Sequence, residues 1–169
     1  MERGWNAMPQ EDDDADAIGA ACALRMLEGD RVSRRLGIAL VSAGAGRAVL
    51  EMTVGEDMLN GFGTCHGGVL YALADTALSC ACNSHNQRSV AHHCSMIYLR
   101  PGRLGDRLLA RAVERTKAGR VGLYDVSVTD ASGAVVGEFL GHARFIGGVV
   151  LETRLEAAEP EVAETAKIV

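Results

Sequence analysis

One aspartate in an apolar run is the residue of this sequence whose position calls most for a chemical explanation. Asp75 lies within residues 69–82, an apolar stretch whose spacing predicts a helix. A carboxylate there loses hydration and has poor helix propensity, so it needs a bonding partner or a chemical task. Ser79 and Tyr71, four residues away on either side, share its helix face. Two interpretations follow: a structural carboxylate bonded to Ser79 or to a strand, or a reactive group.

A glycine-rich loop leads directly into this predicted helix. Residues 60–68 read Asn-Gly-Phe-Gly-Thr-Cys-His-Gly-Gly. The first turn of a helix offers unpaired N–H groups and the positive end of the dipole, which suit an anion or a developing oxyanion. Glycines at Gly67 and Gly68 allow a ligand to approach the backbone. The alternative is a turn that only requires a positive φ.

The spacing of these two features restricts how they can cooperate. Gly67 and Asp75 are eight residues apart, which is about 12 Å along a helix. Groups acting on one carbonyl must lie within about 3 Å of the reacting atoms. If both residues are catalytic, one chain's Gly67 must therefore face another chain's Asp75, so catalysis predicts a dimer with the site at its interface.

The elements that must position these residues follow from the hydrophobic period. We expect a helix over residues 17–35, two strands, and then the apolar helix from Gly67 to about Ser84. The second of the two strands covers residues 47–54, and later strands are expected at 89–99, 106–117, 121–129 and 134–146. Short glycine-containing connections at 117–120 and 130–133 indicate hairpins. The pattern predicts an α+β fold, a curved antiparallel sheet of five to six strands wrapped around one long central helix.

Charge divides the chain into a folded part and two acidic ends. The 169 residues suffice for one domain, and their formal net charge is -5. Residues 1–16 are predicted to form an acidic N-terminal tail and residues 152–169 a C-terminal tail, a mobile segment or a loosely docked helix. Residues 17–151, the predicted domain, hold 14 basic and 11 acidic residues, a net charge of +3. A mildly basic domain suits a phosphate-rich small molecule.

Composition excludes several classes of function. Only 4% of the residues are aromatic, which argues against a stacking surface for nucleic acid. No apolar stretch reaches the roughly 20 residues of a membrane helix, and no signal-peptide pattern is present, so we expect a cytoplasmic protein without membrane contact. The five cysteines show no disulfide spacing and are expected to be buried thiols. A zinc site from Cys65, His66, His92 and His93 is conceivable, but no paired ligand spacing supports it, and no metal is predicted.

Several sequence blocks in order resemble the acyl-CoA thioesterases of the hotdog fold, in particular the phenylacetic acid degradation (PaaI-type) thioesterases. The resemblance covers about residues 20–148. It rests on Met58-Leu59-Asn60-Gly61, Cys65-His66-Gly67-Gly68, Leu73-Ala74-Asp75-Thr76-Ala77, Ala81-Cys82-Asn83-Ser84, Leu99-Arg100-Pro101-Gly102 and Gly147-Gly148. The family's fold agrees with the pattern above.

The resemblance implies a role for each matching residue. Asp75 takes the place of the family's nucleophile or general base, and Gly67 supplies the backbone N–H that polarises the thioester carbonyl. His66 orients the loop, Asn60 lies near the thioester or the attacking water, and Ser79 contributes a hydroxyl that contacts the site. A thioester carbonyl becomes an oxyanion on attack, which suits an N–H donor at a helix start.

The resemblance also implies the substrate and the assembly. We expect hydrolysis of an aromatic acyl-CoA, of the hydroxyphenylacetyl-CoA or phenylacetyl-CoA type, without any cofactor because the CoA thioester is the substrate. Homodimers with shared sites, paired into tetramers, are implied. Gly68 is expected near the substrate. The candidates for binding the CoA phosphates are basic residues near expected strand ends and turns, Arg100, Arg103, Lys117, Arg120 and Arg144, although a basic residue at such a place is more commonly a solvated surface charge.

Other functions compete with this hypothesis. A medium- or long-chain fatty acyl-CoA thioesterase and a non-catalytic acyl-CoA-binding module share its features, and a hotdog dehydratase or hydratase is disfavoured because His66 lies at the oxyanion turn. Cys65 beside His66 suggests a Cys–His nucleophile, but packing is the commoner role of a free cysteine. His92 and His93, adjacent on a strand, point to opposite faces and cannot bind one metal together. One of the two could line an acyl pocket.

Overall fold

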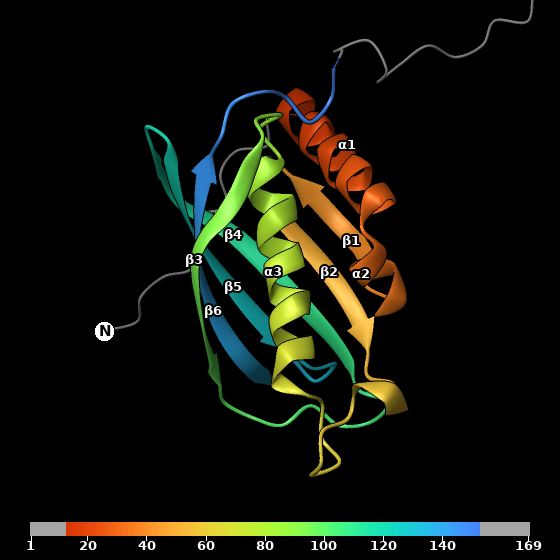
Figure 1. Cartoon of the computed structure of the whole chain (residues 1–169). Coiled ribbons are helices and arrows are strands. Elements are labelled where there is room, and N and C mark those ends of the chain that lie inside the picture. Colours follow the sequence, from red (N-terminus) through yellow and green to blue (C-terminus); the bar gives the residue numbers. More distant parts are fainter. Residues whose placement is uncertain (1–12, 153–169) are drawn as a thin grey trace, which may run out of the picture.

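Six antiparallel strands and one long helix form the framework of the molecule in the computed structural model, which describes residues 13–152. The strands follow the spatial order β1-β2-β4-β5-β6-β3, and helix α3 (Gly67–Asn83) lies across the sheet, which curves around it (Figure 1). The strand bounds are β1 Ala39–Gly44, β2 Arg47–Thr53, β3 Ser89–Tyr98, β4 Arg107–Ala118, β5 Val121–Thr129 and β6 Val135–Phe145. The predicted sheet wrapped around a central helix is confirmed.

The strands present alternate side chains to α3. Along β2, Ala48, Leu50 and Met52 are buried, and they lie in register with Ala112, Ala110 and Leu108 of β4, which are buried as well. This is the period of two that the sequence predicts for a sheet with one covered face. The central helix contributes Leu70, Leu73, Ala74, Ala77, Leu78 and Ala81 to the same core.

Small residues let the helix approach the sheet closely. A Cβ atom at Gly141 on β6 would lie 2.5 Å from Cδ2 of Leu78, so the absence of a side chain there makes room for the leucine. On the opposite side of α3, Tyr71, Ala72, Asp75, Thr76 and Ser79 stay only partly buried. A single chain therefore covers α3 on the sheet side and leaves a stripe of it open.

The N-terminal helix differs from its prediction at both ends. Helix α1 (Asp13–Gly29) starts four residues before the expected position, so the last acids of the run lie in its first turn, where the helix dipole favours them. Asp16 pairs with Arg47 and accepts a 2.9 Å hydrogen bond from the Ala45 N–H, tying α1 to the β1–β2 turn. The predicted tails lie outside the described residues, apart from residues 13–16 and Glu152.

A break at Asp30 divides the expected single helix of residues 17–35 into two. Asp30 is the N-cap of the short helix α2 (Arg31–Arg35), and its carboxylate accepts hydrogen bonds from the N–H groups of Val32 and Ser33. Such a cap satisfies N–H groups that the first turn leaves unpaired. One helical turn, η1 (Glu56–Met58), precedes the glycine-rich loop. No helix among residues 13–152 is long and apolar enough to cross a membrane.

Candidate active site

The start of α3 is held by the side chain of the residue before it. His66 is the N-cap of α3, and its Nδ1 accepts a 2.9 Å hydrogen bond from the N–H of Gly68. A Cβ atom at Gly68 would lie 3.2 Å from that same nitrogen, so a glycine lets the imidazole fold back over the helix end. Within residues 13–152 the N–H of Gly67 has no hydrogen-bond acceptor, and it remains free for a ligand.

Asn60 organises the loop that precedes α3. Its Oδ1 accepts hydrogen bonds from the N–H of Phe62 at 2.9 Å and of Thr64 at 3.2 Å, and its Nδ2 donates to the Thr64 hydroxyl at 3.0 Å. This is the way an asparagine stabilises a turn through its own side chain. The structure thus gives Asn60 a structural task in the loop, and the side chain still borders the pocket described next.

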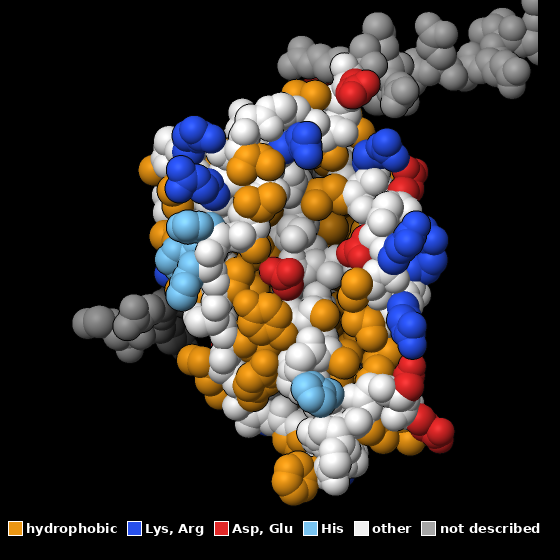
Figure 2. All heavy atoms as spheres, viewed as in Figure 1, with side chains coloured by type: hydrophobic (Ala, Val, Ile, Leu, Met, Phe, Trp, Pro, Cys, Tyr) orange, Lys and Arg blue, Asp and Glu red, His pale blue; other side chains and the backbone are white. Residues whose placement is uncertain are grey.

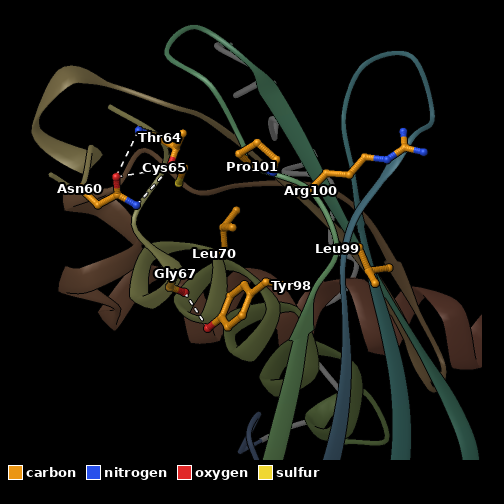
Figure 3. A pocket seen from close by; sticks show the side chains of 9 residues that line it. All are labelled: Asn60, Thr64, Cys65, Gly67, Leu70, Tyr98, Leu99, Arg100 and Pro101. Carbon is orange, nitrogen blue, oxygen red and sulfur yellow. Dashed lines mark hydrogen bonds between the residues drawn. The ribbon is translucent and has the colours of Figure 1, made fainter. Parts of the chain in front are cut away.

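A pocket of about 320 Å³ opens between this loop, the first turn of α3 and the end of β3 (Figure 3). Its lining consists of Asn60, Thr64, Cys65, Gly67, Leu70, Tyr98, Leu99, Arg100 and Pro101. Asn60, Gly67 and Arg100 were predicted from the sequence as site residues. The remaining lining residues were not, and Tyr98 is the most consequential of them.

Tyr98 packs directly on the glycine that offers the free N–H. Its hydroxyl donates a 3.1 Å hydrogen bond to the Gly67 carbonyl oxygen, and a Cβ atom at Gly67 would lie 3.2 Å from the ring (Figure 3). The requirement for glycine at position 67 therefore has a cause within the chain itself. A sequence signal existed, an aromatic residue at the predicted end of a strand, but it does not say which part of the helix that end contacts.

Asp75 lies midway along α3 on its partly open stripe. Burial raises the pKa of its carboxyl above the ordinary aspartate range, and the negative charge of Asp30 raises it further. Within the described residues, neither the Asp75 carboxylate nor the Ser79 hydroxyl makes a hydrogen bond. The structural interpretation, a carboxylate bonded to Ser79 or a strand, finds no contact to support it.

The surface around this stripe is mostly apolar. Figure 2 shows hydrophobic side chains over α3 and along both its sides, acidic side chains near the middle of the face, and basic ones toward its rim. β3 is an edge strand of the sheet. Large exposed side chains lie on it or directly after it, namely Val90, Ile97, Tyr98 and Leu99. The face that holds Asp75 is thus the kind of surface that buries itself against a partner.

The cysteine beside His66 has the environment of a packed thiol. Cys65 is buried, and burial together with the charge of Asp106 raises the pKa of its thiol to about 11. The nucleophilic form of cysteine is the thiolate, which such a pKa disfavours at neutral pH. The His66 ring is engaged with Gly68 rather than with the Cys65 sulfur. The geometry therefore weighs against a Cys–His nucleophile.

The five basic candidates for phosphate binding fall into two groups at opposite ends of α3. Arg100 and Arg103 lie in the connection after β3, beside the start of the helix, where Gly102 accepts a hydrogen bond from the Cys65 N–H. The other three, Lys117, Arg120 and Arg144, gather where the β4–β5 hairpin meets the end of β6. The structure does not bring all five together within one chain.

The histidines outside the loop have separate environments. A bulge displaces His92 from regular pairing, and the His93 ring lies edge-on to the His142 ring at 5.3 Å between centroids. The His85 ring bonds the Glu114 carboxylate at 2.8 Å, which also accepts the Tyr124 hydroxyl at 2.7 Å. The described part of the chain contains no group of three or more His, Cys, Asp or Glu side chains placed to hold a metal ion.

An antiparallel sheet curved around one long helix, with a capped glycine turn at the helix start and a carboxylate halfway along it, defines a protein of the hotdog class. The chain belongs to the thioesterase superfamily, whose family model matches residues 62–136. It is 42% identical over 125 residues to the acyl-coenzyme A thioesterase PaaI of Escherichia coli, covering 74% of this chain and 89% of that protein. The resemblance drawn from the sequence is confirmed.

Solved structures support the same assignment. The structure of the E. coli PaaI protein, from the phenylacetic acid degradation operon, superposes with a TM-score of 0.79 at 40% identity, covering 80% of this chain and 98% of that one. A Streptococcus mutans protein bound to acetyl CoA superposes with a TM-score of 0.64 at 26% identity, covering 66% and 90%. The fold and the family are therefore established together.

Proposed function

We propose that this protein is an acyl-CoA thioesterase that hydrolyses the thioester of an aromatic acyl-CoA to the free acid and CoA. The observation that carries the proposal is that one helix holds both groups without a hydrogen-bond partner among residues 13–152: the Gly67 N–H at the start of α3 and the half-buried Asp75 carboxylate halfway along it. The family and the similarity to PaaI point to the thioester, and the PaaI relative favours the phenylacetyl type of acyl group.

The chemistry assigns one task to each group. The Gly67 N–H donates to the thioester oxygen and stabilises the negative charge that develops there on attack. Asp75 in its ionised form takes a proton from water, whose oxygen then bonds to the carbonyl carbon, or attacks that carbon itself. In either route the C–S bond breaks, and the CoA thiolate leaves and takes up a proton. When water attacks, the free acid forms in that step; when Asp75 attacks, water must then hydrolyse the acyl anhydride formed on Asp75 to release the acid and restore the carboxylate.

Two chains are needed to bring these groups together. Gly67 and Asp75 lie about 12 Å apart along one helix. We expect a homodimer in which the exposed β3 edges pair and the open stripes of two antiparallel α3 helices meet, so that Gly67 faces the partner subunit's Asp75. Such an interface has two-fold symmetry and creates two identical sites. Two dimers pairing into a tetramer, in the cytoplasm, complete the proposal.

The remaining site residues support this reaction by shaping the site or by lying where they could bind CoA. His66 holds the turn that presents Gly67 and Gly68, Asn60 shapes the preceding loop, and Ser79 lies on the Asp75 face. Of the basic residues, Arg100 and Arg103 stand beside the pocket, which makes them the stronger candidates for a CoA phosphate within the same chain. Lys117, Arg120 and Arg144 would have to act from the other end of the helix, across the dimer.

The experiment is a panel of acyl-CoA esters with thiol release followed by a thiol reagent. Phenylacetyl-CoA and its ring-hydroxylated form should turn over faster than medium- and long-chain fatty acyl-CoA. Asp75→Asn should lose at least about a hundredfold in kcat, the usual range for losing a general base. Faster turnover of the fatty acyl-CoA esters would show that these are the substrate class. Tight ester binding without thiol release would show that the protein is a binding module.

Mixing subunits tests the shared site directly. Asp75→Asn and Gly67→Ala chains, refolded together, form mixed dimers with one doubly altered site and one intact site. Activity should then rise well above that of either variant, approaching about a quarter of wild type for random pairing. Simple averaging of the two variant activities would place both groups of a site on one chain.

A further inference from the structure

Asp30, which separates α1 from α2, is connected to the turn of α3 that carries Asp75. Its Oδ2 accepts a 2.5 Å hydrogen bond from the Ser33 hydroxyl, and the Ser33 oxygen lies 3.3 Å from the hydroxyl oxygen of Thr76. Ser33 is only 2% exposed, and Thr76 in turn donates to the Ala72 carbonyl. Ser33 and Thr76 therefore form a part-buried polar contact between α2 and α3. Their hydroxyl protons are already donated, to Asp30 and to the Ala72 carbonyl, so the contact is a close approach of the two oxygens.

We propose that Asp30 is a positioning residue for the hydrolytic reaction, which through Ser33 and Thr76 anchors α2 beside Asp75 and keeps a second negative charge next to that carboxylate. This inference rests on the proposed function, because it assigns Asp30 an effect on the reactivity of Asp75. The resemblance to known thioesterases assigns Asp30 no role in the reaction.

The charge of Asp30 persists under the conditions in which Asp75 titrates. Burial opposes ionisation of Asp30, but hydrogen bonds from the Ser33 hydroxyl and from the N–H groups of Ser33 and Val32 outweigh it and lower the pKa of Asp30. For Asp75, burial raises the pKa and the Asp30 charge adds to that effect. The two carboxylates are thus driven in opposite directions, and Asp30 loses its proton first.

The other groups around Asp75 leave Asp30 as its negatively charged neighbour at neutral pH. Tyr71 and Cys82 on α3 and Cys94 on β3 interact with the Asp75 charge, but burial raises the pKa of each of them, so they stay neutral. The arginines of α2, at positions 31, 34 and 35, are exposed to solvent, where water and salt screen their charges.

A neighbouring negative charge changes what Asp75 can do as a base. A carboxylate that binds a proton more tightly is a stronger base or nucleophile, provided that the working pH keeps it ionised. Activity that needs ionised Asp75 rises with pH as Asp75 loses its proton, which is the acid limb of the pH profile, and then reaches a plateau. Removing the Asp30 charge should therefore have opposite effects on the activity at low pH and on the plateau. Asp75 ionises at lower pH, which raises activity there, and it becomes a weaker base, which lowers the activity on the plateau.

The test compares kcat/KM against pH for Asp30→Asn and Asp30→Ser with the wild-type protein. Asparagine and serine are both good N-caps, so each keeps the start of α2 while removing the charge. Asp14→Asn, an exposed position in the first turn of α1, makes the same change in net charge far from the site. Asp30→Glu restores the charge and should return the profile toward wild type.

The expected result is a crossing. At low pH, where Asp75 is mostly protonated, both uncharged variants should have a higher kcat/KM than wild type, and on the plateau a lower one. Asp14→Asn should follow the wild type at every pH. An equal loss of kcat/KM at every pH would overturn the role of Asp30. So would an acid limb at the same pH as in wild type for both variants. Failure of the proposed function looks different, since wild type would then release no thiol or Asp75→Asn would remain fully active.

Discussion

The Tyr98 ring lies against Gly67, and the Tyr98 hydroxyl donates a 3.1 Å hydrogen bond to the Gly67 carbonyl oxygen. The contact joins the end of an edge strand to the first turn of the central helix. The N–H proposed to polarise the substrate belongs to the same glycine. The precision of the oxyanion contact is therefore tied to a side chain from β3.

Gly67→Ala should disturb this arrangement without unfolding the protein. The new Cβ atom would lie 3.2–3.3 Å from the Tyr98 ring, which must shift or push the helix start away from its place. A displacement of about 1 Å at a reacting centre can cost about a hundredfold in rate. We expect kcat to fall by 10- to 100-fold, measured by thiol release.

A second substitution separates the crowding from other effects. Gly67→Ala combined with Tyr98→Ala should recover part of the lost kcat, because the ring that the Cβ atom meets is gone. Identical kcat values for the single and the double variant would contradict crowding by Tyr98 as the cause.

Asp75→Asn should make the protein more resistant to heat at neutral pH. The folded-state pKa of Asp75 lies above that of an aspartate in an unfolded chain, about 3.9. The stability from its protonated form is fully present below about 3.9 and is lost as the pH rises through the folded-state pKa. A neutral asparagine avoids this loss, so the Tm at pH 7 should rise by a few degrees.

The pH dependence of that gain is the decisive part of the measurement. The Tm difference between Asp75→Asn and wild type should shrink as the pH is lowered toward about 4. Asp57→Asn, an exposed position in η1, serves as the control and should show no such pattern. An equal difference at every pH would show that ionisation of Asp75 is not its source.

Cys65→Ala should retain thiol release within a few-fold of wild type. Burial keeps the Cys65 thiol protonated at neutral pH, since it raises the pKa to about 11, so the sulfur has no nucleophilic task in the proposed reaction. Loss of its packing should cost about 1 kcal/mol of unfolding free energy, measured with denaturant. A loss of more than a hundredfold in kcat with an intact fold would reinstate Cys65 as the nucleophile.

Gly141→Ala should destabilise the fold by overfilling the space between β6 and α3. The added Cβ atom would lie 2.5 Å from Cδ2 of Leu78, and such overpacking costs about 1–3 kcal/mol. The partner variant Leu78→Val shortens the side chain that is in the way. In thermal unfolding the double variant should lose less than the two single variants summed, while strict additivity would place the strain elsewhere.

The sequence predicts α3 and the strands β2 to β6 nearly residue by residue because their burial alternates so regularly, whereas the first strand, β1, is expected without bounds. Ala48, Leu50 and Met52 lie on one face of β2, and α3 begins at the predicted residue, Gly67. The beginning of α1 was missed since an acidic run suits a solvated tail and the first turn of a helix equally well. The break after Gly29 did carry a signal, because Asp30 followed by Ser33 is a plausible cap, but the apolar period continued through it.

The site was predictable where one stretch of chain contains it, and not where distant stretches meet. His66, Gly67 and Asp75 are local to α3 and its entry. Tyr98 contacts Gly67 across 31 positions of sequence. Asp30 bonds Ser33 of α2, whose hydroxyl oxygen lies against that of Thr76, the residue that follows Asp75 on α3. The basic residues were grouped as one set because all lie near strand ends, but the sequence does not reveal at which end of α3 each strand ends.

The distance between Gly67 and Asp75 along α3 also links activity to protein concentration. A solitary chain holds every reactive group of the proposed site and yet cannot bring two of them to one thioester. Dilution below the dimer dissociation constant would then abolish activity without unfolding the protein. Specific activity would be proportional to the fraction of chains in dimers. Any substitution that weakens dimerisation through the β3 edge would lower turnover at a site it does not touch. Raising the protein concentration would reverse that loss.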